Sequence, residues 1–558
     1  MARMRWALLL LLVAPLAAAD LESFVEVYQQ DSGALSRRYD LGPSPERIER
    51  MRAFYTATSE QLQAVDFDAL DQAGKLDWVL MSETLADESR RIDEYEFRLE
   101  EVAPALPFAD ELAGLHEARR RMEEVDARET ATQLTALLGQ VDEARKSAEE
   151  LELAKTVAHR ASRILGELRQ ALKRWYEFHA GYDPLFTWWN AKPYEALGKK
   201  LEEYQTYLRE EKAGAKDPDT IIGDPIGREP LLADLRYERI PYTPEELIEI
   251  AEQEFAWCDR EMLRASREMG FGDDWHAAME KVKTLHVEPG EQPVLIRRLA
   301  LEATDFLETR ELLTIPRLAK ETWRMSMMSP ERQKVSPFFL GGEQIIVSYP
   351  TDQMDHADKL MSLRGNNIHF SRATVHHELI PGHHLQQFMT RRYQAHRRLF
   401  DTPFWTEGWS LYWEMRLWDL DFPKTPEDRV GFLFWRMHRC ARIIFSLKFH
   451  LGEMTPEESI DFLVDRVGHE RANAEAEVRR SFLGTYPPLY QCAYMLGALQ
   501  FRELYREAVV EGEMGEAEFH DAILRLGRIP VDLVRATITG QPIRREMPVD
   551  WRFYPGIE

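Results

Sequence analysis

Apolar residues recur at helical spacing along the first part of the chain. Positions with relative offsets of 0, 3, 4 and 7 are occupied by Leu134, Leu137, Leu138 and Val141. Charged and polar residues fill the positions between them, as in a helix with one buried face. Ser44-Pro45 is typical of a helix start, because serine caps the helix and proline suits its first turn. The pattern therefore predicts a layer of helices over residues 20–227.

Further helix starts are marked by a hydroxyl residue, a proline and early acids. This combination occurs at Thr243-Pro244-Glu245, Ser329-Pro330-Glu331, Thr425-Pro426-Glu427 and Thr455-Pro456-Glu457. The hydroxyl caps the first turn and the acids suit the helix dipole. Between residues 212 and 230 the chain is instead rich in Gly, Pro and Asp, which break regular structure. We place a boundary there, between an N-terminal helical subdomain (20–227) and a second subdomain (228–558).

One segment has the pattern of a strand. Residues 344–350 are mostly β-branched or apolar, follow Gly341-Gly342 and end at a proline, so a short strand is predicted. Lying just before a histidine-rich segment, such a strand could offer an edge to an extended peptide. The alternative is a structural hairpin without a ligand.

Residues 1–19 have the pattern of an export signal. Arg3 and Arg5 precede an apolar run, and Ala17-Ala18-Ala19 supplies the small residues required for cleavage. We expect cleavage after Ala19, no membrane span afterwards, and a periplasmic or secreted protein. A retained membrane anchor is the alternative, although the apolar run is short for a span.

Composition narrows the class of protein. The 558 residues are 44% hydrophobic and 30% charged, which is ordinary for a folded globular protein. The formal charge is -25, or -27 without Arg3 and Arg5, and disfavours nucleic acid as a partner. The three cysteines are widely spaced, so they do not form a disulfide scaffold. No pattern indicates an oligomeric state.

The candidate chemistry lies in nine consecutive positions, 376–384. They contain His376, His377, Glu378, His383 and His384. So many ionisable side chains are costly to bury without a cation, so a metal site is the first hypothesis. His377-Glu378 is how a zinc metalloprotease helix begins, with a ligand followed by the acid that activates water. However, Pro381 stands where the second histidine usually follows.

Helix geometry alone does not select the second ligand. On an ideal helix, residues seven apart share a face, which pairs His377 with His384, or else His376 with His383. Pro381 makes an ideal helix the wrong assumption, because it removes a backbone donor and clashes with the preceding turn. A break or bulge at Pro381-Gly382 would let His383 take the second ligand position. The choice between His383 and His384 stays open on these grounds.

The whole motif resembles a known family. It consists of His377-Glu378-x-x-Pro381-Gly382-His383, then Leu385-Gln386, Glu407-Gly408-Trp409, Tyr412 and Glu414. This is similar to the bacterial domain of unknown function 885, which is related to the gluzincin metallopeptidases. The match is dense over residues 336–497 and faint before residue 227. The resemblance implies a mainly α-helical, zincin-like fold, a Zn2+ ion and hydrolysis of an amide bond.

The resemblance also implies the roles of individual residues. It selects His377 and His383 as ligands, and Glu407 looks like the third zinc ligand of gluzincin aminopeptidases. Two histidines and one glutamate leave a coordination position open for water, as a catalytic zinc needs. Glu378 would act as general base. Glu414, seven residues after Glu407, would orient a ligand imidazole, or else pair with a nearby arginine.

Hydrolysis also needs a donor for the developing oxyanion. Residues 488–497 agree only in part with the family segment that contains this donor, but Tyr494 stays in register and is our choice. Tyr486 and Tyr490 are rivals. Positive groups for a substrate carboxylate could come from residues 436–442 or from Arg479-Arg480, although salt bridges in the core explain these arginines equally well.

These expectations combine into one fold and one leading function. We expect two helical subdomains that enclose a cleft, with a short β-sheet near the metal helix. Residues 228–558 would be the metallopeptidase-like catalytic part. The leading hypothesis is an exported zinc-dependent peptidase acting on peptides. The alternatives are a zinc amidase acting on cell-wall or other non-peptide amides, and a non-catalytic binding protein in which Pro381 has disabled the motif.

Overall fold

The computed structural model describes residues 21–217, 219–333, 336, 338–484 and 486–557. The export signal predicted in residues 1–19 lies outside these residues. Over the described ranges the chain forms 23 α-helices and one two-stranded sheet. The prediction of a mainly α-helical protein is therefore confirmed.

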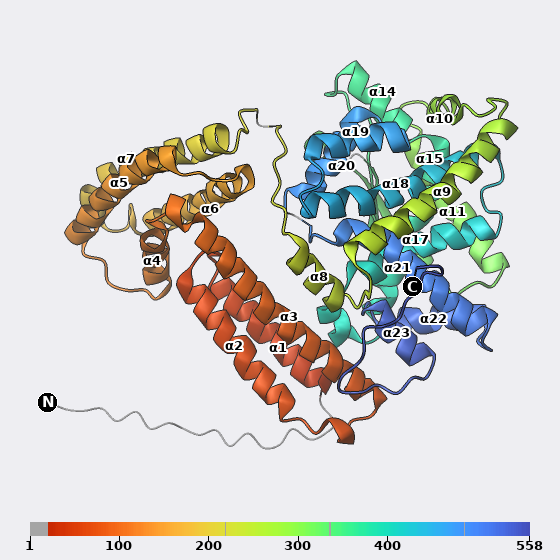
Figure 1. Cartoon of the computed structure of the whole chain (residues 1–558), viewed down its shortest axis with the longest axis horizontal. Helices are drawn as coiled ribbons and strands as arrows, with labels where there is room; N and C mark the ends of the chain where they lie inside the picture. Colours follow the sequence, from red (N-terminus) through yellow and green to blue (C-terminus); the bar gives the residue numbers. More distant parts are fainter. Residues whose placement is uncertain (1–20, 218, 334–335, 337, 485, 558) are drawn as a thin grey trace.

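Seven helices precede the stretch that is rich in helix breakers (Figure 1). They are α1 (Leu21–Arg38), α2 (Pro45–Gln63), α3 (Gln72–Val102), α4 (Ala109–Arg120), α5 (Ala127–Glu150), α6 (Lys155–His179) and α7 (Pro184–Tyr207). The described residues of 213–227 form neither helix nor strand. The subdomain boundary predicted at residue 227 falls at the end of this connection and stays a prediction.

Sixteen helices follow. They are α8 (Arg228–Tyr237), α9 (Pro244–Glu268), α10 (Trp275–Lys283), α11 (Gln292–Thr309), α12 (Arg317–Thr322), α13 (Pro330–Gln333), α14 (His356–Gly365), α15 (Ile368–Glu378), α16 (His383–Thr390), α17 (Pro403–Asp419), α18 (Pro426–His450), α19 (Pro456–Val467), α20 (Arg471–Phe482), α21 (Tyr490–Tyr505), α22 (Glu516–Leu526) and α23 (Val531–Ile538).

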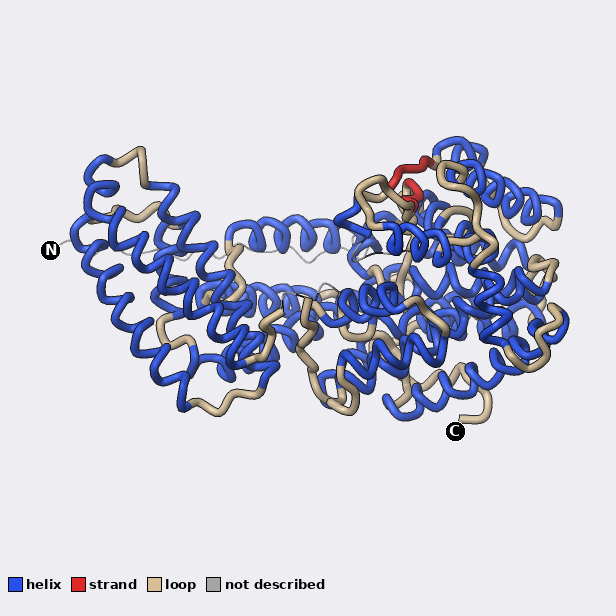
Figure 2. The backbone as a smooth tube through the Cα atoms, turned by 90° about the horizontal axis from the view of Figure 1, so that it is seen from above, coloured by secondary structure: helices blue, strands red, loops and turns tan. Residues whose placement is uncertain are grey.

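The helices pack around two large hydrophobic cores, and helices that follow one another in the sequence do not always share a core. Helices α4–α7, here called the arm, enclose a core of their own that includes Leu134, Leu168 and Trp175. Most buried residues of α1–α3 instead belong to the core that most of the later helices share. We call α8–α23 the body. Figures 1 and 2 show the arm extending to one side of the body, with α3 running between them.

The helix starts predicted from hydroxyl-proline pairs are confirmed. Thr243, Thr425 and Thr455 cap α9, α18 and α19, and each threonine side chain accepts a hydrogen bond from the backbone N–H three residues later. Ser44 caps α2 in the same way. These caps satisfy backbone donors that the first helical turn leaves unpaired.

The predicted strand is present and has neighbours on both sides. Strand β2 (Gln344–Val347) pairs in parallel with β1 (Arg324–Met327). On its other side, Ile346 exchanges two backbone hydrogen bonds with Leu340, of 2.8 and 3.0 Å. The exposed edge of the sheet is therefore β1. The sequence pattern had suggested that residues 344–350 would form the edge open to a peptide. Val347 and Val375 share a small core, which holds β2 beside α15.

Helices α17 and α21 touch through their backbones. A methyl group added to Gly497 would lie 1.9 Å from the carbonyl oxygen of Phe404, and one added to Gly408 would lie 2.5 Å from the Cα of Gly497. Only glycine allows such an approach at both positions. The contact brings Glu407 on α17 close to the tyrosines at the start of α21.

Candidate metal centre

The histidine-rich segment is interrupted where the sequence predicted a break. Helix α15 ends at Glu378 and α16 begins at His383, with Leu379–Gly382 forming a turn between them. The N–H of Gly382 donates to the carbonyl of His376 at 3.0 Å. A methyl group at Gly382 would lie 1.8 Å from the carbonyl oxygen of His377, so the turn needs glycine there. The interruption spans the whole of residues 379–382, more than a bulge at Pro381-Gly382 alone.

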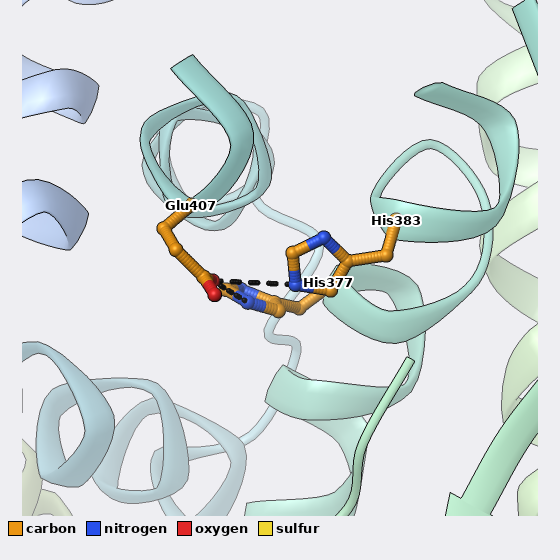
Figure 3. Close-up of side chains that lie close together, drawn as sticks. All are labelled: His377, His383 and Glu407. Atoms are coloured by element: carbon orange, nitrogen blue, oxygen red, sulfur yellow. Dashed lines mark ion pairs between the residues drawn. The ribbon is translucent and has the colours of Figure 1, made fainter. Parts of the chain in front are cut away.

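This turn directs two histidines toward Glu407. His377 is on the last turn of α15, His383 is the first residue of α16, and Glu407 comes from α17 (Figure 3). The Oε2 atom of Glu407 lies 3.4 Å from Nε2 of His377 and 3.2 Å from Nε2 of His383. All three side chains are buried, and their possible ligand atoms lie within 4.8 Å of one another.

The spacing of these atoms fits a small divalent cation. Ligands at about 2.0 to 2.1 Å from a tetrahedral zinc ion are separated from each other by about 3.3 to 3.4 Å. In addition, Oε2 of Glu407 is buried and finds no hydrogen-bond partner among the described residues. A buried carboxylate oxygen without a partner is costly. The three residues could therefore hold a metal ion.

The electrostatics of the cluster favour a bound positive charge. Burial opposes the charge of Glu407, yet the adjacent His383 and His377 hold the pKa of its carboxyl well below the ordinary value. Burial likewise lowers the pKa of His377, but contacts with Glu407 and Glu414 outweigh it and raise this pKa to about 9. The carboxylates thus attract a cation into the site, whether a proton or a metal ion.

Each of the three residues is held by a further side chain. Nδ1 of His377 lies 2.7 Å from Oε1 of Glu414, so the orienting contact predicted for Glu414 is present. Tyr490 donates to Oε1 of Glu407 at 2.5 Å. Such contacts fix the orientation of a metal ligand. The role of Tyr490 was missed, because the family segment has no tyrosine at that position.

His383 is held by two residues that sequence reasoning left without a role. Its Nδ1 lies 3.1 Å from Nε2 of Gln386 and 3.5 Å from Oγ of Ser410. Gln386 also donates to the carbonyl of Thr406 at 2.9 Å and to Ser410 at 3.1 Å. The spacing could have indicated both residues. Gln386 follows His383 by three positions and Ser410 follows Glu407 by three, so each lies on the same helix face as a proposed ligand.

Glu378 lies beside the cluster and is almost fully buried. Its Oε2 is 3.9 Å from Nε2 of His383, and 8% of the residue is exposed. A methyl group at Gly341 would lie 2.3 Å from Oε2 of Glu378 and 2.6 Å from its carbonyl oxygen, so Gly341 allows the segment before β2 to pass directly over it. Burial raises the pKa of Glu378, against the effect of the two histidines. Such a carboxylate is a better proton acceptor than an exposed one.

The other two histidines of the segment point elsewhere. His384 places Nδ1 3.1 Å from the carbonyl of Gly342 and Nε2 2.9 Å from that of Ala319. His376 contacts the carbonyl of Arg372 through Nδ1 at 3.0 Å, and its ring packs on Phe432. The structure therefore brings His383, and not His384, together with His377 and Glu407.

The three candidate tyrosines lie in a row beside the cluster. The ring of Tyr494 stacks on His377 with centroids 6.2 Å apart, and the ring of Tyr490 lies 5.8 Å from Tyr494. Tyr486 follows at 4.3 Å from Tyr490. Burial raises the pKa of Tyr494 to about 12, so its phenol keeps its proton and can donate a hydrogen bond.

Comparison with known families identifies the chain. The profile of a bacterial family of unknown function, DUF885, matches residues 28–538. The chain belongs to the DUF885 family. The match includes the early helices, where the resemblance in sequence is faint. No curated protein sequence matches this DUF885 protein.

Solved structures with the same fold exist for two other bacterial proteins. One is a candidate lipoprotein of unknown function from Shewanella oneidensis, with 17% identity and a TM-score of 0.69, covering 93% of this chain and 100% of its own. The other is a candidate lipoprotein from Colwellia psychrerythraea, with 16% identity and a TM-score of 0.60, covering 94% and 98%. At these identities the likeness concerns the fold alone. Among the described residues of this DUF885 protein, no helix is both long and apolar enough to cross a membrane.

Proposed function

We propose that this DUF885 protein is a zinc-dependent peptidase with a zincin-like catalytic body. The observation that carries the proposal is the convergence of Nε2 of His377, Nε2 of His383 and Oε2 of Glu407, with Glu378 beside them. Two histidines, one glutamate and an adjacent acid are the ligand and base set of zinc hydrolases. A zinc ion bound there would polarise the substrate carbonyl and make a water molecule more acidic.

The residues of the chain would divide the remaining work. Glu378 accepts a proton from the attacking water and delivers it to the leaving amine, which its raised pKa supports. Glu414 keeps the imidazole of His377 in one orientation, and Tyr490 does the same for the carboxylate of Glu407. Burial of the cluster excludes bulk water and strengthens these electrostatic interactions.

Tyr494 is the proposed donor to the developing oxyanion. It lies against His377, and its phenol stays protonated because burial raises its pKa. Tyr490 already donates to Glu407, so it acts mainly on the ligand set. Replacing Tyr494 with Phe should lower kcat by about 100-fold while zinc content stays at one ion per chain. Tyr490→Phe should instead weaken zinc binding, measured by competition with a chelator. The reverse pattern would exchange the two roles.

The decisive experiment combines metal analysis with hydrolysis. We expect about one zinc ion per chain in the purified protein. Glu378→Gln should keep the zinc and lower peptide hydrolysis by at least about 1,000-fold, because the general base is removed without a change in shape. His377→Ala should lose both zinc and activity. His384→Gln is the matched control, since this neighbouring histidine points away from the cluster and its loss should leave the zinc in place.

The outcome also separates the alternatives. Peptides and cell-wall amides are offered side by side, and turnover of the amides alone would replace the peptidase by an amidase. A protein that binds no zinc and is unaffected by His377→Ala would refute the proposal. We further propose export of this protein, supported by the pattern of residues 1–19 and by the description of both structural neighbours as candidate lipoproteins. Cell fractionation tests it, and a cytoplasmic protein would contradict it.

A further inference from the structure

Three arginines gather beside the tyrosine row. Arg439 and Arg442, both on α18, lie over the ring of Tyr494 with their guanidinium carbons 4.6 and 4.3 Å from its centroid. Arg480, on α20, lies over the ring of Tyr486 at 4.7 Å. Because Tyr494 stacks on His377, the arginines are one aromatic ring away from the proposed metal ligands. We call Arg439, Arg442 and Arg480 the arginine cluster.

Two acidic side chains contact the cluster directly, Glu477 and Glu414. Arg442 binds Glu477 through Nε and Nη2, at 2.7 Å each, and Arg480 lies 3.9 Å from the same carboxylate. Arg439 is 4.0 Å from Glu414, but that carboxylate is already bound to His377 at 2.7 Å. Arg442 and Arg480 thus share Glu477, and Arg439 has a longer contact with a carboxylate that is already bound to His377.

Two guanidinium groups also have donors to spare. Among the described residues, Nε of Arg439 and Nη1 of Arg442 are buried and have no hydrogen-bond partner. The two residues are only 5% and 2% exposed. Burying a charged donor without an acceptor is costly, and proteins usually avoid it unless a ligand supplies the acceptor. The cluster therefore has the charge and the free donors to bind an anion.

Arg436, on the same helix, has a carboxylate of its own, Glu254, although its Nε also lacks a hydrogen-bond partner among the described residues. It is also buried, yet it donates to Glu254 at 2.6 Å and lies over the ring of Trp257 at 3.9 Å. It faces α9, away from the tyrosine row. Arg439, by contrast, has only the 4.0 Å contact with Glu414, and it lies beside Tyr494 next to the candidate metal centre.

The cluster can be approached from solvent. Arg480, Tyr486 and Tyr490 are partly exposed. Tyr486 and Ser481 also line a cavity of about 480 Å³, whose opposite wall comes from α3 and α6 and includes Arg98 and Arg163. An extended ligand could thus reach the cluster from the side where the arm and the body face each other.

We propose that the arginine cluster binds the C-terminal carboxylate of a peptide, so that the protein removes residues from that end. This rests on the proposed peptidase function. A carboxylate matches the planar guanidinium geometry and can accept two parallel hydrogen bonds. Its two oxygens can accept from the donors of Arg439 and Arg442 that have no partner among the described residues. Binding the chain end here leaves a peptide bond near the residues that would cleave it.

The first test compares two substrates on the unmodified protein. Short N-acetylated peptides with a free C-terminus and the same peptides with a C-terminal amide differ only in the group that the cluster would bind. The free acids should be hydrolysed with at least a 10-fold higher kcat/KM. Arg439→Met should lower kcat/KM for the free acids by 10-fold or more and leave the amides within about 2-fold. Equal hydrolysis of acids and amides by the unmodified protein would overturn the proposal while leaving the peptidase function intact.

A second test measures binding without turnover. Zinc-loaded Glu378→Gln protein is titrated by calorimetry with an N-acetyl dipeptide and with its amide. The acid should bind at least 10-fold more tightly, and Arg439→Met in the same background should remove the difference. Arg436→Met is the matched control and should preserve it. Should Arg439→Met fail to fold, Arg439→Lys keeps the charge but loses the paired donors, and should retain only part of the preference. Selective binding of the acid by a protein that hydrolyses no peptide would uphold the carboxylate site and refute the peptidase function.

Discussion

Helices α6 and α18 have the same length of 25 residues but bury different surfaces. In the arm, α6 buries one stripe of mainly small and apolar residues, such as Leu168 and Trp175, and exposes its charges. In the body, α18 is buried from Val430 to Leu447, and this stretch includes three arginines and a histidine, Arg436, His438, Arg439 and Arg442. The arm buries a few titratable groups, such as His116 and Glu117 on α4, but its helix α6 exposes most of its charges, whereas α18 in the body keeps several charged side chains inside. Such groups are retained where a site uses them.

The largest difference in stability is expected when one buried charge of the body and one exposed charge of the arm are removed. Glu477→Gln leaves Arg442 buried without its partner and should lower the free energy of unfolding by about 3 to 5 kcal/mol. The matched change in the arm is Glu149→Gln, which removes an exposed pair with Arg145 worth at most about 0.5 kcal/mol. Urea denaturation followed by circular dichroism measures both. Equal losses would mean that the buried pair is not special.

The next largest loss of stability is expected where the backbones of α17 and α21 touch. Gly497→Ala forces α17 and α21 apart, because the new methyl group would meet the carbonyl of Phe404. We expect a loss of about 1 to 3 kcal/mol and weaker zinc binding, since Glu407 and Tyr490 separate. In the arm, Gly139 has no atom within 4 Å of an added methyl group, so Gly139→Ala should gain up to about 1 kcal/mol from helix propensity.

These two glycine variants are compared by denaturation midpoint and by zinc content. A destabilised Gly497→Ala protein that still binds zinc with unchanged affinity would show that the helix contact serves the fold alone. Loss of stability in Gly139→Ala would contradict the simple packing of the arm.

The smallest effect is a dependence on pH. Burial raises the pKa of Glu238 from 4.5 to about 7, against a hydrogen bond from Thr402. The folded protein therefore keeps a proton that the unfolded chain has released, so stability should fall as the pH rises from about 4.5 to 7 and then level off. Glu238→Gln should remove this slope, which is at most about 1.4 kcal/mol per pH unit. Thermal unfolding between pH 5 and 8 tests it, with the exposed Glu143→Gln in the arm as a control whose profile should not change.

Much of the fold was visible in the sequence because it depends on local chemistry. Threonine before proline and early acids placed the starts of α9, α18 and α19 correctly, since capping is decided within one turn. The run of β-branched and apolar residues after Gly341-Gly342 likewise located β2. The neighbour on its second side, Leu340, was not predicted, because pairing depends on how the preceding turn folds back.

In the candidate site, too, the local features were predictable from the sequence and the tertiary ones were not. The break at Pro381-Gly382 follows from proline geometry, but the choice of His383 over His384 depends on where α16 restarts, which is a tertiary outcome. Gly408 and Gly497 were noticed as parts of motifs, yet their contact joins two helices far apart in sequence. Periodicity cannot tell which arginines of α18 face the metal centre, because that helix has no exposed face to serve as a reference.

Asp77 links the early helices to the segment between two of the proposed metal ligands. Its carboxylate, on α3, accepts hydrogen bonds from Arg397 at 2.6 Å and His396 at 3.0 Å, across 320 and 319 residues. Both partners lie in the connection between α16 and α17, and therefore between His383 and Glu407. Contacts of such long range form late, since they close very large loops. Uptake of the proposed zinc ion during refolding should therefore lag behind helix formation, and its time course would show when Asp77 has reached Arg397 and His396.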